Sequence, residues 1–87
     1  MQVLNARAVG RTAPNAVYVG RPSPFGNPFA IGRDGNRDDV IAKFEHWVRA
    51  RPALVERVKA ELKGKSLICW CAPCRCHADV LLRIAND

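Results

Sequence analysis

The fold is decided by one stretch of the sequence, Leu67-Ile-Cys-Trp-Cys-Ala-Pro-Cys-Arg-Cys-His-Ala-Asp-Val80. All four cysteines lie in it, at positions 69, 71, 74 and 76, and one of the two histidines, His77, follows the last of them. Residues 66–71 form a mainly apolar run that suits a buried strand. Residues 77–85 place apolar side chains on one face of a helix. The stretch therefore predicts a strand, a tight turn that gathers the cysteines, and a final helix.

Length and charge restrict the class of protein. The chain has 87 residues, enough for one domain, residues 1–87, with a single small core. A hydrophobic content of 48% and a charged content of 25% are typical of a soluble globular domain. The net charge is +6, and ten of the 14 basic residues are arginines, which suit bidentate contacts with phosphate or carboxylate. The basic charge either keeps the surface soluble or holds an anion or nucleic acid.

No targeting or membrane segment is expected. The first five residues are too few for the apolar region of a signal peptide, and no apolar run reaches transmembrane length. We therefore expect a cytoplasmic protein that does not bind membranes. In a reducing compartment, clustered cysteines stay as thiols or bind metal, and four cysteines within eight residues are too crowded for two relaxed disulfides.

Two strands and a stiff loop are predicted in the first third of the chain. Residues 1–5 and 16–20 have the β-branched and aromatic content of strands, and a basic loop over residues 6–15 joins them. The segment over residues 21–29 contains three prolines and Gly26, which exclude a helix or a central strand. It therefore predicts a rigid loop that follows the second strand.

Two amphipathic helices are predicted in the middle of the chain. Asn36 is an N-cap residue, and Asp39 three positions later completes a weak capping box. The first helix runs from there to about residue 50, and the second begins near Pro52 and ends before Gly64. The order β-β-α-α-β-α predicts an α/β or α+β fold, with a small single sheet of about three strands and three helices.

Three interpretations of the cysteine turn stay open. The first is a tetrahedral zinc site, for which the available ligands are Cys69, Cys71, Cys74, Cys76 and His77. Its spacing is atypical, because structural zinc sites usually combine two pairs from separate parts of a chain. The second is a reactive thiol at Cys76, next to Arg75 and at a helix N-terminus, where thiolates are favoured. The third is that cysteines such as Cys69 only fill space in the core.

The loop over residues 21–29 also has two interpretations. Its prolines and phenylalanines can form a rigid cover over the core. Alternatively, Arg21, Ser23 and Asn27 present a guanidinium, a hydroxyl and an amide from one stiff loop, as binding loops do. Arg37, at the start of the next helix, adds a second guanidinium where the helix dipole does not favour one, which indicates a role in anion binding.

Three motifs in the same order carry a resemblance to a known family. They are Tyr18-Val-Gly-Arg-Pro-Ser-Pro-Phe-Gly-Asn-Pro-Phe29, Gly35-Asn-Arg-Asp-Asp-Val-Ile41 and Leu62-Lys-Gly-Lys-Ser-Leu-Ile-Cys-Trp-Cys-Ala-Pro-Cys-Arg-Cys-His-Ala-Asp-Val-Leu81. Over most of its length the chain resembles the domain-of-unknown-function 4326 family (DUF4326), which occurs in bacteria and their phages. The resemblance brings no established activity. For a phage-encoded member, the cytoplasm would be that of the host.

The resemblance also implies which positions belong to the family pattern. These are Arg21, Gly26, Asn27, Pro28, Arg37, Cys69, Trp70, Cys71, Pro73, Cys76, His77 and Asp79. Cys74 falls on a position that the pattern leaves free, so a four-cysteine zinc site is not implied by the family.

Two functional hypotheses follow. If the second and third strands are parallel neighbours, their carboxyl ends bring the loop and the cysteine turn to one rim, where α/β sheets bind ligands. A phosphate-bearing, nucleotide-like ligand would then be held by Arg21 and Arg37. Cysteine-dependent chemistry would use Cys71 or Cys76 as nucleophile and His77 or Asp79 as acid or base.

The alternative is a non-enzymatic basic module, stabilised by zinc in one version, that binds nucleic acid or a partner protein. The aromatic side chains of Trp47, Trp70, Phe25 and Tyr18 would then add stacking on bases, although the helical spacing of Trp47 favours a place in the core. The sequence leaves open whether the protein is an enzyme, and also its oligomeric state, for which a homodimer is one option.

Overall fold

A three-stranded parallel sheet organises the chain. The computed structural model describes residues 2–21, 23–71 and 74–86. The strands are β1 (Val3–Asn5), β2 (Ala16–Tyr18) and β3 (Ser66–Cys69), in the order β1-β3-β2. Both pairings are parallel, so β3 is central and its neighbours come from the other end of the sequence. The predicted α/β class is thus confirmed.

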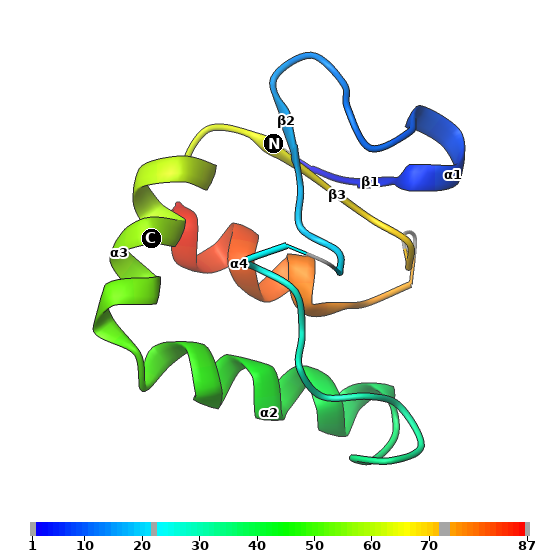
Figure 1. Cartoon of the computed structure of the whole chain (residues 1–87), viewed down its shortest axis with the longest axis vertical. Helices are drawn as coiled ribbons and strands as arrows, with labels where there is room; N and C mark the ends of the chain where they lie inside the picture. The colour runs from blue at the N-terminus through cyan, green and yellow to red at the C-terminus, as the bar shows by residue number, and fades with distance from the viewer. Residues whose placement is uncertain (1, 22, 72–73, 87) are drawn as a thin grey trace.

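Three helices lie on one side of this sheet (Figure 1). They are α2 (Arg37–Arg49), α3 (Pro52–Leu62) and α4 (His77–Ala85). Helix α4 contacts β1 and β3 as well as α2 and α3, so it lies between the sheet and α2 (Figure 1). This central place explains its pattern of burial, in which five of its nine residues are buried.

The core lies between the sheet and the helices. Its largest fully buried side chains include Val19, Phe44, Leu62, Leu67 and Leu81, and each is less than 2% exposed. They come from β3, from the residue that follows β2 and from all three long helices. The amphipathic stripes expected in the sequence therefore meet in one cluster, as the hydrophobic effect requires in a domain of this size.

The start of α2 is fixed by the predicted capping box. The side-chain oxygen of Asn36 accepts a hydrogen bond from the backbone N–H of Asp39, and an Asp39 carboxylate oxygen accepts one from the N–H of Asn36, each 2.9 Å long. Gly35 precedes the box with φ +127°, and a Cβ there would lie 2.5 Å from the Asp39 side chain. Glycine is therefore required at this position, and it sets the point at which Arg37 enters the helix.

The structure corrects the sequence predictions in a few places. Residues 6–9, predicted as part of a loop, form a fourth helix of one turn, α1 (Ala6–Val9). Its N-cap is Asn5, whose side-chain oxygen accepts a 2.7 Å hydrogen bond from the N–H of Arg7. The strand expected over residues 16–20 ends at Tyr18, and the strand expected over residues 66–71 ends at Cys69. Met1, part of the predicted first strand, lies outside the described residues.

Candidate functional site

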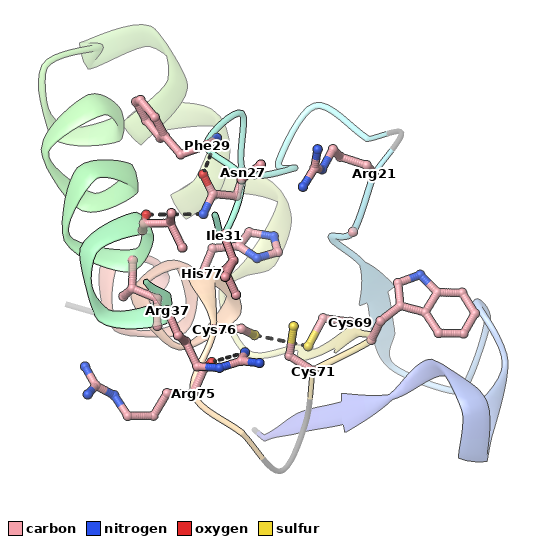
Figure 2. Close-up of a pocket in the computed structure, with 15 residues that line it drawn as sticks. Arg21, Asn27, Phe29, Ile31, Arg37, Cys69, Cys71, Arg75, Cys76 and His77 are labelled. Carbon is pink, nitrogen blue, oxygen red and sulfur yellow. Dashed lines mark hydrogen bonds between the residues drawn. The ribbon is translucent and has the colours of Figure 1, made fainter. Parts of the chain in front are cut away.

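A cavity of about 410 Å³ opens where β2 and β3 end, and Figure 2 shows the residues around it. The parallel pairing of these strands places the loop after β2 and the turn after β3 at the same edge. The described residues that line the cavity are Gly20, Arg21, Asn27, Phe29, Ala30, Ile31, Arg37, Val40, Ile41, Cys69, Trp70, Cys71, Arg75, Cys76 and His77. Six of the residues predicted for ligand binding or catalysis are thus brought together, and Ser23 and Asp79 are not among them.

Two guanidinium groups give the cavity its charge. Arg37 donates a 3.0 Å hydrogen bond to the backbone carbonyl of Arg75, and its hydrogen bond with the Cys71 side chain raises the pKa of the guanidinium. The Arg21 side chain is directed toward the cavity from the opposite loop (Figure 2). None of the described lining residues is an aspartate or a glutamate. The cavity is therefore electropositive.

Arg75 contributes its backbone to the cavity more than its charge. Its guanidinium donates to the carboxylate of Asp38 over 2.8 Å and points away from the thiols (Figure 2). Both partners of this ion pair are well exposed, so the pair adds little stability. Its carbonyl instead holds Arg37 in place, which ties the turn to the start of α2.

Cys69 and Cys76 form a close thiol pair at the base of the cavity. Their sulfur atoms are 3.1 Å apart, and the two residues are 1% and 4% exposed. The hydrogen bond with Cys69 and then burial raise the pKa of the Cys76 thiol, which is the opposite of the lowering that its helix N-terminus predicts. Cys71 is less buried and contacts Arg37, so it is the better placed of the two predicted nucleophiles.

His77 is held in one tautomer. Its Nε2 lies 2.8 Å from the backbone carbonyl of Val19, and because a carbonyl can only accept, Nε2 carries the proton. The edge of the imidazole packs against the Phe44 ring, with centroids 5.1 Å apart. Burial lowers the pKa of His77, and the nearby Arg21 charge lowers it further. The ring is therefore neutral near pH 7, with Nδ1 as an acceptor.

Asn27 has a structural role in the loop. Its Nδ2 donates a 3.3 Å hydrogen bond to the carbonyl of Val40, and its Oδ1 accepts a 2.9 Å bond from the N–H of Phe29. The residue is buried, so these bonds fasten the loop to α2 and shape the cavity wall. Ser23 accepts from the N–H of Phe25 and supports the same loop outside the cavity.

The other predicted residues lie around the turn. A carboxylate oxygen of Asp79 accepts a 2.9 Å hydrogen bond from the N–H of Cys76, which caps α4. Cys74 is exposed and is not among the described lining residues. Within the described ranges, no three metal-ligating side chains gather closely enough to hold an ion, and zinc at this turn stays a prediction.

An aromatic cluster borders the cavity and was only partly expected. Trp70 is 46% exposed, and its Nε1 donates to the hydroxyl of Tyr18 over 2.9 Å. The Arg11 guanidinium lies over both rings, 4.9 Å from the centroid of Tyr18 and 5.7 Å from that of Trp70. Ile31 is an exposed apolar residue at the cavity that was not predicted from the sequence. The signal that could have indicated it is an isoleucine within a glycine-rich turn.

Comparison with known proteins gives a family and nothing finer. Along the part of the chain that the structure describes, no helix has the length and apolar character that crossing a membrane requires. No curated protein and no solved structure matches the sequence significantly. A family model described as "Domain of unknown function (DUF4326)" matches residues 4–87, so the chain belongs to this family, as the three motifs predict.

Proposed function

We propose that this protein binds a phosphate-bearing, nucleotide-like ligand in the cavity between the loop after β2 and the turn after β3. One observation carries the proposal: Arg21 and Arg37 line a cavity of about 410 Å³ whose described lining contains no carboxylate. Neither arginine takes part in an ion pair among the described residues. Two unpaired guanidinium groups facing one cavity are suited to a multiply charged anion.

The size and polarity of the cavity favour a ligand larger than phosphate alone. Small-molecule sites usually measure about 300–1,000 Å³ and combine apolar walls with a few polar groups. Phe29, Ile31 and Val40 supply apolar surface here. Nδ1 of His77, unprotonated because Nε2 donates to Val19, offers an acceptor for a ligand hydroxyl. A phosphate joined to a sugar or base uses all of these groups.

The thiols define what chemistry to look for. Cys71 lines the cavity, contacts the Arg37 guanidinium and is more accessible than Cys76, so it is the thiol that we propose as nucleophile in any cysteine-dependent reaction. Cys71→Ser separates the two parts of the proposal. It should keep ligand binding, because the arginines remain, and abolish turnover if a reaction exists.

Titration calorimetry with inorganic pyrophosphate and with purine and pyrimidine nucleoside monophosphates tests the binding proposal. We expect at least one of these ligands to bind, and Arg21→Gln or Arg37→Gln to weaken its affinity by about tenfold or more. Arg49→Gln is the matched control, because it removes the same charge from an exposed position on α2 outside the cavity. Binding that is equally weak in all three variants, or absent for every ligand, would contradict the proposal.

A second candidate function is favoured by the cluster of Arg11, Tyr18 and Trp70. An exposed tryptophan held by a hydrogen bond next to a guanidinium is a suitable platform for the bases of single-stranded nucleic acid. Anisotropy with labelled oligonucleotides checks it: Trp70→Ala should reduce binding, and the exposed α1 variant Val9→Ala should not. Affinity that is unchanged in Trp70→Ala, or that does not weaken as salt rises, would contradict this function.

A further inference from the structure

We infer that Cys69 and Cys76 are a site of reversible oxidation at which an intramolecular disulfide forms across the base of the cavity. Their sulfur atoms already lie 3.1 Å apart. The inference needs no ligand, so it stands or falls independently of the proposed function.

The elements that carry the two thiols hold them in this arrangement. Cys69 is the last residue of β3, the central strand, and Cys76 is the N-cap of α4. Asp79 fixes the backbone of Cys76 by accepting its N–H, so the cap does not depend on the thiol. The sulfur–sulfur distance in a disulfide is about 2.05 Å, so bond formation shortens the present distance by about 1 Å.

Oxidants reach the pair through the cavity. Both residues are buried against bulk solvent, yet both line the cavity together with Cys71 (Figure 2). A small oxidant of the peroxide class fits in this cavity of about 410 Å³. Cys74 is exposed and is not among the described residues that line the cavity.

The reaction balances with hydrogen peroxide as the oxidant. One thiol of the pair loses its proton and its sulfur attacks a peroxide oxygen. The O–O bond breaks, and a sulfenic acid and a hydroxide form, the hydroxide taking up the released proton to give water. The second thiol then attacks the sulfenic sulfur, the S–S bond forms, and the sulfenic oxygen leaves as water. In sum, two thiols and one peroxide give one disulfide and two waters, and a dithiol reductant reverses the change.

The test uses the full chain with Cys71→Ser and Cys74→Ser, which leaves only the buried pair. Dilute hydrogen peroxide at mildly alkaline pH should remove both thiols together, and the intact mass should fall by two hydrogen atoms. Peptide mapping without reductant should show Cys69 joined to Cys76. Reductant should restore both thiols, and oxidation should raise the melting temperature, because the bond ties β3 to α4.

Adding Cys69→Ala to this variant provides the control. The single remaining thiol cannot form an intramolecular disulfide, so the mass of the monomer should rise by oxygen instead of falling. Should the double variant fold poorly, peptide mapping of the oxidised wild-type chain decides the matter by the bond that it shows. Two results would overturn the inference. One is a mass gain of oxygen atoms without a Cys69–Cys76 bond, and the other is a Cys71–Cys74 bond in place of it in the wild type.

Discussion

The Nε2 atom of His77 donates a hydrogen bond to the backbone carbonyl of Val19 across 2.8 Å, which joins the first turn of α4 to the end of β2. Burial against Phe44 keeps this imidazole neutral and lowers its pKa from the usual 6.5. The contact therefore serves two purposes. It joins two elements at the cavity that His77 lines, and it leaves Nδ1 as the unprotonated nitrogen of the ring.

Stability should depend on pH through His77. Its pKa in the folded protein lies below 6.5, so as pH falls the unfolded chain takes up a proton first. The contribution of His77 to the free energy of unfolding is complete above about pH 6.5. It is lost as pH falls from there toward the lower folded pKa. Urea denaturation at pH 7.5 and 5.5 should show this loss in the wild type.

The pH effect has a matched control. His77→Gln keeps a donor for Val19 but no titrating ring, so its stability should change much less between the two pH values. His46→Gln removes the other histidine, which is exposed on α2, and should behave like the wild type. If both variants lost equal stability between pH 7.5 and 5.5, the pH effect would come from a group other than His77.

The charge of Arg21 should be measurable at His77. Arg21 lowers the pKa of the imidazole, although burial is the larger cause. Arg21→Gln should therefore raise the His77 pKa in a proton NMR titration, while Arg49→Gln should leave it unchanged. A bound phosphate that neutralises Arg21 should shift the pKa in the same direction, which gives a second readout of binding at this cavity. If neither Arg21→Gln nor bound phosphate shifted the His77 pKa, the charge of Arg21 would not act on this imidazole.

Much of the fold follows from the sequence because strong local signals agree with one another. The box of Asn36 and Asp39 and the apolar stripes predict α2, α3 and α4. Helix α1 could not be predicted, because a helix of four residues buries too little and has too few hydrogen bonds for periodicity to show. The order β1-β3-β2 depends on non-local pairing, which no spacing rule specifies.

The site was predictable by location more than by role. The parallel pairing of β2 and β3 brings Arg21, Asn27, Cys71 and His77 to one cavity, and Arg37 joins them from the start of α2. Whether a side chain is then free depends on its neighbours. Asn27 uses both ends of its amide within the protein, and the contact of Cys76 depends on the path of a turn that sequence spacing does not define.

Asn27 should be more important for stability than an exposed asparagine with as many hydrogen bonds. Asn27→Ala removes both hydrogen bonds of this buried side chain and takes from the N–H of Phe29 its acceptor, which should cost about 1–3 kcal/mol in the free energy of unfolding. Asn86→Ala also removes two bonds, but both lie at the exposed surface, where water can replace them. Chemical denaturation should therefore show a clearly smaller loss for Asn86→Ala, and equal losses would contradict the structural role of Asn27.

Two of the four thiols should react quickly and the other two should be protected. Cys74 is exposed and Cys71 is partly exposed, whereas Cys69 and Cys76 are buried, so a bulky thiol reagent should label two cysteines quickly and two only after unfolding. Cys71→Ser and Cys74→Ser should each remove one fast thiol. Because Cys71 lines the cavity and Cys74 is not among its described lining, a bound nucleotide should slow labelling of Cys71 alone. Equal protection of both would place the ligand elsewhere, and four equal rates would contradict the buried pair.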